Sequence, residues 1–377
     1  MDLALSEEQV ALQDSTRTLL AKAFPTAQVR ACEIAPRTAM AAYNKLDAHG
    51  LGGLLVPEVH GGVGLGAVEM VVVQIELGRA LVPALYTDST VVAATALLTA
   101  ANPEFAAVIE GIASGQIKLA CALGCSEDTL PVFVERGGRR VLEGRVGFVT
   151  EAELADWLLV AARDETGGAM LCLIKSDAVG LALVSLANLA DQDMANIVFD
   201  GVLDVRVIAS GDAALRAIAA SDRALKLAMA AQAVGGAEQV FSLARDYACT
   251  REQFGQPIGA FQAIAHMLAD GAVNIAGASM LVHRAAAALD GSAAGGEASP
   301  DCWIDMAKLK ACQVFRDVSA MAIQVHGGIG FTLEAAPQLY FRRAKHLQLM
   351  HGEPLDLMTT IGATVLAGDH RMLDSNG

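Results

Sequence analysis

Two segments in the last third of the chain combine arginine, glycine and aromatic residues at spacings suited to a phosphorylated ligand. In the first, Arg251, Phe254 and Gly255 lie just before Pro257, between two helical stretches. An arginine beside a glycine turn can hold a phosphate through charge-assisted hydrogen bonds, while a neighbouring ring covers a base. The alternative is structural, because an arginine and an aromatic residue at a helix end often only complete the local packing.

The second segment covers residues 324–332, with the sequence QVHGGIGFT, and follows an amphipathic stretch. Paired glycines at a helix end permit positive φ and expose backbone N–H groups, which bind an anion without side-chain charge. A simple helix stop is the alternative, and His326 there suits packing or capping better than ligand binding. Taken alone, each segment leaves both interpretations open.

The elements that must position these segments are predicted to be helical at the start of the chain. Residues 6–9 have the form of a capping box before a helix that Pro25 limits, and further helices are expected over 38–49 and 67–78. The glycine-rich run 61–66 lacks the Lys-Ser/Thr of a phosphate loop, so it is predicted to be a connector.

A β-rich region is expected next, followed by a second helical region. Short apolar and β-branched runs alternate there with Gly137-Gly138 and Asp200-Gly201 turns, a spacing typical of an antiparallel sandwich or barrel. Long amphipathic helices are then expected over 212–250, 261–290, 302–325 and 355–366. The sequence therefore predicts an α+β fold with a helical domain (1–116), an antiparallel β domain (117–210) and a helical bundle (211–377).

Composition excludes several function classes. The formal net charge of −15 disfavours nucleic acid and anionic membranes as partners, since both require a basic surface. No apolar run approaches the roughly 18 residues of a spanning helix, and the acidic start lacks the features of a signal peptide. The seven cysteines are scattered without a Cys-x-x-Cys pair, which predicts reduced residues and no disulfide framework or metal site. We expect a soluble, cytoplasmic protein.

Together, the order and spacing of the motifs resemble one flavoprotein family. The pattern Arg-x-x-Phe-Gly-x-x-Ile-x-x-x-Gln from Arg251, then Gln-x-His-Gly-Gly-x-Gly-Phe from Gln324, and then Arg-Arg-Ala-Lys from Arg342, is similar to the acyl-CoA dehydrogenases. The resemblance spans essentially the whole chain, because length and α–β–α order also match. It implies a helical N-terminal domain, a β domain and a C-terminal four-helix bundle, usually assembled as a tetramer.

The resemblance also implies FAD as a cofactor bound between protomers, an acyl-CoA substrate, and an electron-transfer flavoprotein or similar acceptor. Arg251 is similar to the arginine that contacts the FAD pyrophosphate of the neighbouring protomer, and Phe254 to the ring beside the adenosine part. On the β domain, Phe148 and Thr150 match the aromatic and threonine residues that cover the flavin ring. The positions that complete the dinucleotide site across the dimer are Gln262, Gln324, Gly327 and Gly328.

The chain departs from the family pattern at two places. The Thr-Glu-Pro turn that precedes the flavin corresponds here to the run 125–128, CSED, in which Ser126 offers a hydroxyl. The catalytic glutamate of the family's Glu-Gly-Thr sequence is replaced by His351, and the alternative glutamate position on an early bundle helix holds Leu225. Neither standard base is present, and Glu353 is the nearest carboxylate along the loop.

This departure leaves three hypotheses open. The family's base removes an α-proton beside the thioester while the β-hydrogen leaves as hydride to flavin, so it must be aimed at the α-carbon. In the first hypothesis, His351 or Glu353 is an atypical base in an active homotetramer. In the second, the chain is a base-lacking subunit that shares a flavin site in a heterotetramer with a catalytic paralogue. In the third, the fold serves another flavin reaction, such as that of an oxidase or monooxygenase.

Overall fold

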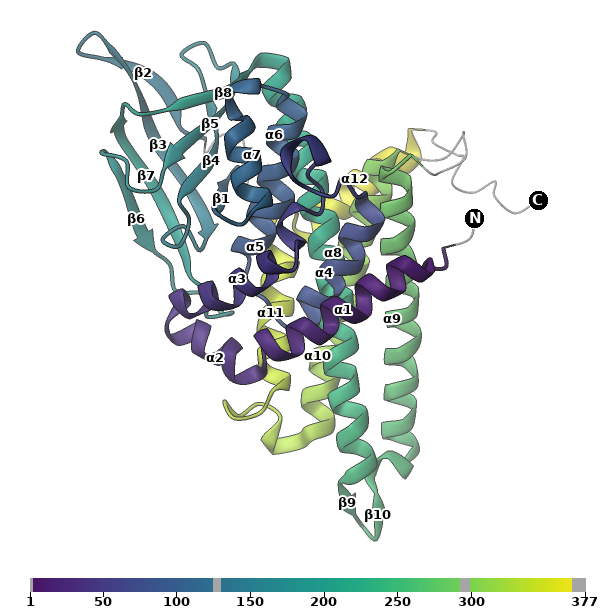
Figure 1. Ribbon diagram of the computed structural model, residues 1–377. Coiled ribbons are helices and arrows are strands. Elements are labelled where there is room, and N and C mark those ends of the chain that lie inside the picture. The colour runs from purple at the N-terminus through teal and green to yellow at the C-terminus, as the bar shows by residue number, and fades with distance from the viewer. Residues whose placement is uncertain (1–2, 125–129, 292–298, 368–377) are drawn as a thin grey trace. The chain divides into compact units, whose positions relative to one another are not determined.

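The computed structural model describes residues 3–124, 130–291 and 299–367, and divides into two compact units (Figure 1). The bundle unit comprises Met1–Thr26, Ala67–Val82 and Lys226–Gly377, and the sheet unit comprises Ala27–Gly66 and Pro83–Leu225. Each unit thus takes part of the N-terminal helical region, and the division falls inside the 40-residue helix α8 (Gly211–Thr250). The three-part division at 116 and 210 stays a prediction.

The bundle unit consists of helices and one short hairpin. The Ser6 side chain accepts a hydrogen bond from the Gln9 N–H and the Gln9 side chain accepts one from the Ser6 N–H, so the predicted capping box is confirmed. The elements are α1 (Glu7–Ala23), α4 (Ala67–Arg79), part of α8, β9 (Glu252–Gln253), β10 (Gln256–Pro257), η7 (Ile258–Ala260), α9 (Gln262–Leu289), α10 (Pro300–His326), η8 (Gly327–Ile329), α11 (Pro337–Leu349) and α12 (Pro354–Leu366).

Glycines allow α4 and α8 to pack backbone against backbone. A Cβ at Gly235 would lie 1.8 Å from the Ile75 carbonyl oxygen, and a Cβ at Gly78 would lie 2.1 Å from that of Gln232. Beside this contact, the buried Gln232 side chain donates to the Gln74 side chain at an N–O distance of 2.8 Å. Only glycine fits such a close approach, so the two glycines fix the position of α8 along α4.

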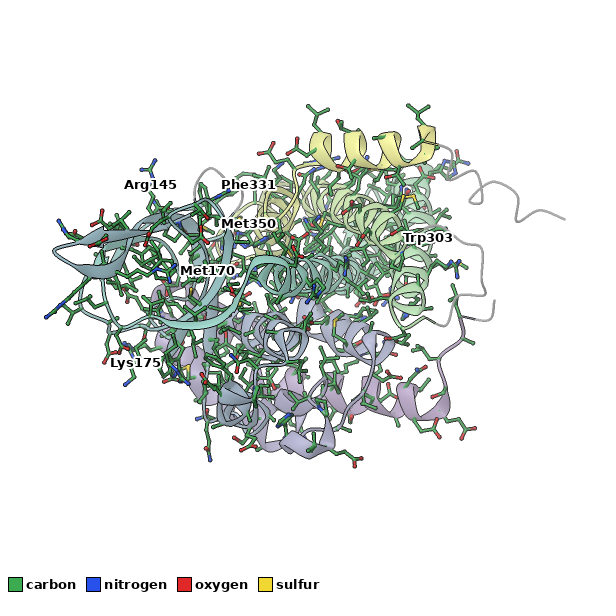
Figure 2. All side chains as sticks on the ribbon, turned by 90° about the horizontal axis from the view of Figure 1, so that it is seen from above. Arg145, Met170, Lys175, Trp303, Phe331 and Met350 are labelled. Carbon is green, nitrogen blue, oxygen red and sulfur yellow. The ribbon has the colours of Figure 1, made fainter. Side chains whose placement is uncertain are left out.

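Helix α9 is, within the described residues, the one helix long and apolar enough to cross a membrane by length and composition. Packed helices of soluble proteins also pass that test. In this unit α9 packs against α10 and α4. The guanidinium of Arg284 lies 4.9 Å from the centroid of the Trp303 ring, and Trp303 on α10 is labelled in Figure 2. Asp290 at the end of α9 accepts hydrogen bonds from the N–H groups of Ala67 and Val68, which begin α4.

The helices of the sheet unit are mostly short. A 3-10 turn precedes α3, so the helix expected over 38–49 is shorter than predicted, because Pro36 favours the tighter first turn. The elements are α2 (Thr26–Ile34), η1 (Pro36–Ala39), α3 (Met40–Ala48), η2 (Leu51–Gly53), η3 (Glu58–His60), α5 (Leu85–Thr87), the π-helical turn η4 (Asp88–Ala93), α6 (Ala94–Ala100), η5 (Pro103–Phe105), α7 (Ala106–Ala113) and part of α8.

Eight strands form one sheet in the order β6-β7-β3-β2-β4-β5-β8, with β1 also paired to β4. The predicted fold class is confirmed, but the expectation of a wholly antiparallel β domain is wrong, since β1 and β2 both pair with β4 in parallel. Strand direction depends on the connections, which residue alternation does not encode. The strands are β1 (Leu119–Ala122), β2 (Val132–Arg136), β3 (Arg139–Thr150), β4 (Trp157–Arg163), β5 (Ala169–Lys175), β6 (Leu181–Ser185), β7 (Met194–Val202) and β8 (Arg206–Ser210).

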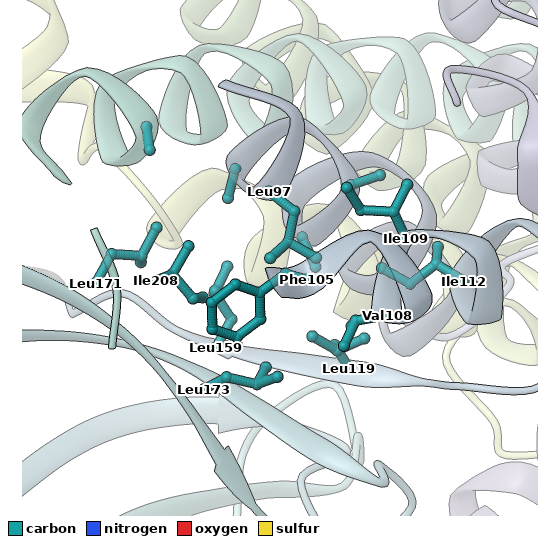
Figure 3. Close-up of a cluster of buried hydrophobic side chains, with 14 of the residues drawn as sticks. Leu97, Phe105, Val108, Ile109, Ile112, Leu119, Leu159, Leu171, Leu173 and Ile208 are labelled. Carbon is teal, nitrogen blue, oxygen red and sulfur yellow. The ribbon is translucent and has the colours of Figure 1, made fainter. Parts of the chain in front are cut away.

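A hydrophobic cluster joins the helices of this unit to one face of its sheet (Figure 3). Phe105 and Ile112, from η5 and α7, are buried against Leu159 and Leu171, from β4 and β5. Burying side chains of this size contributes about 1.5–3 kcal/mol each relative to exposure. The cluster therefore anchors β1, β4, β5 and β8, which belong to the same sheet as β3, the strand that carries the candidate flavin residues.

Candidate functional site

The arginine segment forms a hairpin that begins where α8 ends. The Ile258 N–H donates to the Arg251 carbonyl oxygen at 2.8 Å and closes the hairpin between β9 and β10. At its tip Phe254 has φ +55 and Gly255 has φ +83, and the Phe254 side chain is 92% exposed. The Phe254 ring meets the edge of Phe261 at 6.1 Å between centroids. The local fold thus presents an exposed ring beside an exposed arginine.

The glycine segment ends α10. Gly327 has φ +64, and a Cβ at Gly327 or Gly328 would have no other atom within 4 Å. The positive φ explains a glycine at the first position, while open space at both leaves room for a ligand to reach the backbone. Both glycines and Gln324 are exposed.

Two stacked rings bring these segments to the same end of the bundle unit. Tyr247 lies one turn before Arg251 on α8, and its ring stacks on that of His326, which precedes Gly327, at 4.3 Å between centroids. His326 Nδ1 also lies 2.8 Å from the Ala322 carbonyl oxygen. The histidine therefore packs and caps the helix, as its sequence context favours.

All six residues predicted for the dinucleotide site on this unit are exposed: Arg251, Phe254, Gln262, Gln324, Gly327 and Gly328. A guanidinium, approachable backbone amides and an aromatic face suit a pyrophosphate and the base attached to it. Their exposure suits donation to a neighbouring protomer. The chemistry of this donor set fits FAD, and the role of each residue stays a prediction.

The end of β3 carries the other candidate pair. The register of β3 against β7 shifts between Val146 and Val149, which marks a β-bulge, and within it Phe148 has φ +61 and is 54% exposed. Thr150, two residues on, is buried and its hydroxyl donates to the Asp88 Oδ2 at 3.2 Å. A bulge re-aims a side chain, here turning a large ring toward solvent. Ser126 lies outside the described residues.

The loop between α11 and α12 carries the predicted base position. His351 has φ +52 and is half-buried, and Gly352 follows with φ +112. Glu353 is exposed at the N-cap of α12, where its side chain makes no capping hydrogen bond. Leu225, the alternative position, is buried on α8. Neither of the two positions where the family has its catalytic glutamate, here 351 and 225, therefore holds an acid.

Basic groups lie near His346 on α11, the helix that precedes this loop. The ammonium of Lys308, which is fully buried on α10, donates to the Leu347 carbonyl oxygen at the end of α11. Burial is the largest cause that lowers the pKa of His346 to about 3, and electrostatic interactions with Arg343, His351 and Lys308 contribute to the same shift. The Arg343 guanidinium donates to the Val82 and Leu81 carbonyl oxygens at 2.8 and 3.1 Å. The environment of His346 is therefore cationic.

A separate pocket of about 580 Å³ lies between α4, α8 and α9. Arg79 in its wall pairs with Glu76 and Glu238, and burial raises the pKa of Glu238. Arg245, also in the wall, pairs with Asp246. These charges are matched within the bundle unit, and the pocket includes none of the predicted site residues.

Sequence reasoning missed two buried polar groups near the candidate residues. Lys308 supports the base loop, and its spacing of four from Cys312, whose sulfur lies 3.5 Å from the ammonium, gives no distinctive pattern. Asp88 bonds Thr150, and it is the lone acid in the apolar stretch 80–101. That isolated acid was a usable signal, because charged residues are rarely buried without a specific partner.

Comparisons with known proteins agree with these observations. The acyl-CoA dehydrogenase N-terminal and C-terminal domain models match residues 6–116 and 223–366. Acyl-CoA dehydrogenase IpdE2 of Mycobacterium tuberculosis is 30% identical over 366 residues, which cover 95% of this chain and 98% of the relative. Subunit CarC of the caffeyl-CoA reductase-Etf complex of Acetobacterium woodii is 28% identical over 331 residues, covering 82% and 85%.

Among solved structures, a chain of the ChsE4-ChsE5 complex of Mycobacterium tuberculosis is 25% identical and superposes with a TM-score of 0.84. The superposition covers 97% of this chain and 99% of that one. Matches at both ends, across nearly the whole length, leave one assignment: the chain belongs to the acyl-CoA dehydrogenase family.

Proposed function

We propose that this chain is a subunit of an FAD-dependent acyl-CoA dehydrogenase that introduces an α,β double bond into an acyl-CoA thioester, and that it shares a flavin site without supplying the base. The observation that carries the proposal is that His351, and not a carboxylate, occupies the position of the family's base. FAD, when bound, accepts the hydride that leaves the β-carbon.

Two sets of residues would hold the cofactor, each in a different protomer. Phe148 and Thr150 on β3 would cover the flavin ring in their own protomer. Arg251 and the Gly327 backbone would bind the pyrophosphate of a neighbour's FAD, with Phe254 beside the adenosine. The solvent exposure of the second set supports this arrangement, since exposed groups are available to another protomer. We expect a tetramer built as a dimer of dimers.

The proposed absence of a base follows from charge and polarity. An α-proton needs an acceptor within hydrogen-bond reach. At the family's base position this chain has His351 instead of a carboxylate, and His346, which interacts electrostatically with His351, lies near Arg343 and Lys308. At the alternative position, the Leu225 side chain cannot accept a proton. The base would come instead from a paralogous subunit with an intact glutamate.

Heteromeric assembly has support among the similar proteins. ChsE4-ChsE5 is a complex of two different proteins, and CarC is by name a subunit of a complex with Etf. We extend both features to this chain: a heterotetramer with a catalytic paralogue, and an electron-transfer flavoprotein or similar protein as acceptor. We also propose a cytoplasmic location, which is consistent with the acidic composition.

The test is to purify the chain alone, load it with FAD, and mix it with acyl-CoAs without oxygen. We expect FAD to bind, because a homomer contains both residue sets, and the oxidised flavin spectrum to persist. A preparation co-purified with the glutamate-bearing paralogue should be bleached by the same acyl-CoA. Rapid bleaching of the chain alone would refute the base-lacking assignment, and failure to bind FAD in either form would refute the flavin site.

A second candidate is an active homomeric dehydrogenase that uses Glu353. The favouring observation is that this carboxylate is exposed and makes no capping hydrogen bond, so it is available to accept a proton. Under this alternative, E353Q would abolish the bleaching and H351Q would not. Under the base-lacking proposal, the parent chain alone shows no bleaching by acyl-CoA, so E353Q and H351Q should give the same spectrum as the parent.

A further inference from the structure

Asp88 is a buried acid in direct contact with a candidate flavin residue. It begins the π-helical turn η4 and is 6% exposed. Its carboxyl accepts the Thr150 hydroxyl at 3.2 Å and the backbone N–H of Cys121, and the Cys121 thiol donates to its carbonyl oxygen at 3.4 Å. π-helical turns occur often at functional sites, and this one directs an acid at the side of Thr150 that faces the protein interior.

A second buried acid lies beside the first. Glu151 follows Thr150, has φ +50, and is 3% exposed. It accepts the Tyr43 hydroxyl at 3.1 Å and the Leu85 N–H at 2.7 Å. Thr150 therefore stands between two carboxyls, and only Asp88 is hydrogen-bonded to its hydroxyl among the described residues.

We propose that Asp88 is a positioning residue of the flavin site, which acts by setting whether the Thr150 hydroxyl donates or accepts a hydrogen bond at the cofactor. This inference rests on the flavin role proposed above for Thr150. Asp88 itself need not touch the cofactor. No other described residue offers the threonine hydroxyl a titratable partner.

The chemistry of the pair gives two states. An ionised carboxylate can only accept hydrogen bonds, so the Thr150 hydroxyl donates to it. The Thr150 oxygen then remains able to accept a hydrogen bond from a ligand. A protonated carboxyl can donate to that oxygen, which frees the hydroxyl proton for the ligand. Burial, followed by the nearby charge of Glu151, raises the pKa of Asp88 to about 7, against the opposing effect of the hydrogen bonds from Thr150 and Cys121. The two states therefore exchange near neutral pH.

The other titratable groups around Asp88 do not provide this exchange. Burial, and then Asp88 itself, raise the pKa of the Cys121 thiol well above its usual range. Burial, followed by Asp47, does the same for Tyr86, which lies next to η4 on α5. Glu151 is bonded to Tyr43 and Leu85 instead of Thr150. Lys118 is paired with Asp47 at 2.7 Å, away from the threonine.

The test is a pH titration of the visible spectrum of the FAD-loaded full chain, between pH 5 and 9. Four proteins are compared: the parent, D88N, T150V and T150S. We expect a spectral change with a midpoint near pH 7 in the parent and in T150S, which keeps the hydroxyl. D88N should show no such change, because asparagine cannot ionise. T150V should show none either, because valine has no hydroxyl through which the ionisation of Asp88 could alter the hydrogen bond to the flavin.

The alternatives give different results. If D88N and the parent titrate alike, Asp88 has no role in the flavin site. If D88N is silent but T150V titrates like the parent, Asp88 acts by charge alone, and the positioning role is overturned. If D88N does not fold, the T150V and T150S pair still decides between these outcomes.

An infrared measurement on the FAD-free chain separates this inference from the proposed function. A neutral-carboxyl band should disappear with a midpoint near pH 7, and its frequency should shift in T150V, which removes the hydrogen bond. Absence of that band overturns the inference even where FAD binds normally. If the band is present but FAD does not bind, the proposed flavin site fails and this inference fails with it.

Discussion

The imidazole of His326 lies on the ring of Tyr247, with the two planes 20° from parallel. One ring belongs to the end of α8 and the other to the end of α10, so the pair ties the arginine hairpin to the glycine turn. Such pairs contribute about 0.5–1.5 kcal/mol beyond their burial. Two candidate ligand-binding segments that are some 70 residues apart in sequence are thus held together at one end of the bundle unit.

Arg251→Ala should weaken FAD retention. Loss of a charge-assisted contact to phosphate costs about 1.5–3 kcal/mol, or roughly 10- to 150-fold in affinity. Flavin fluorescence during dialysis measures the retention. Arg245→Ala is the matched control, since it removes the same charge six residues earlier, on α8, where Asp246 already pairs with it. Equal retention in both variants would exclude Arg251 from the site.

Gly235→Ala should destabilise the bundle unit severely. The added Cβ would meet the Ile75 backbone at 1.8 Å, and backbone cannot move aside as a side chain can. We expect a loss of about 3 kcal/mol or more, at the upper end of overpacking effects. Gly277→Ala on α9, where a Cβ meets nothing within 4 Å, should instead stabilise by about 0.5–1 kcal/mol. Urea unfolding of both variants checks the contrast.

Asp88→Asn should stabilise the protein at neutral pH and above. The pKa of Asp88 is about 7 in the folded protein, against a usual value of 3.8. Its stabilising contribution is therefore complete below pH 3.8 and is lost as pH rises through 7. The asparagine cannot ionise, so its advantage should grow across that window to at most about 4 kcal/mol. Thermal unfolding at pH 4.5 and 8 measures it; an equal difference at both would contradict the raised pKa.

His351→Glu should create dehydrogenation activity in the isolated chain. It restores a carboxylate at the family's base position, and a positioned base contributes about 10²–10⁴-fold in rate. Anaerobic bleaching of bound FAD by acyl-CoA is the readout, with H351Q as the control of equal size that lacks the charge. If H351E stays silent while FAD remains bound, the loop does not aim residue 351 at the substrate.

The repeating patterns in the sequence predicted most elements well. Helix α4 was expected over 67–78 and runs Ala67–Arg79, and α10 was expected over 302–325 and runs Pro300–His326. Helix α11 was missed, because it is short and its apolar residues are spaced among charged ones. The π-helical turn at Asp88 was also missed, since a single inserted residue in a helix leaves the apolar pattern nearly unchanged.

The candidate site was only partly predictable, for a physical reason. Arg251 and Phe254 are exposed candidates whose proposed roles depend on a short local motif, so local sequence is enough to suggest them. The Asp88–Thr150 hydrogen bond joins residues 62 apart in sequence, and only the folded chain brings them together. The positive φ of Phe148 likewise arises from tertiary constraints, since a bulky aromatic residue rarely adopts that conformation.

The order of segments within the bundle unit has a consequence for synthesis of the protein on the ribosome. Helices α1 and α4 emerge early, but their partners in that unit begin only at Lys226. The nascent chain must therefore carry the apolar α4, including Val71, Val73 and Ile75, with α1 beside it but without its neighbours from α8 and α9 while about 150 further residues are made. The sheet unit, by contrast, has all of its residues by Leu225. Nascent chains stalled before this point should accordingly bind chaperones through α4, and release them once α8 is complete.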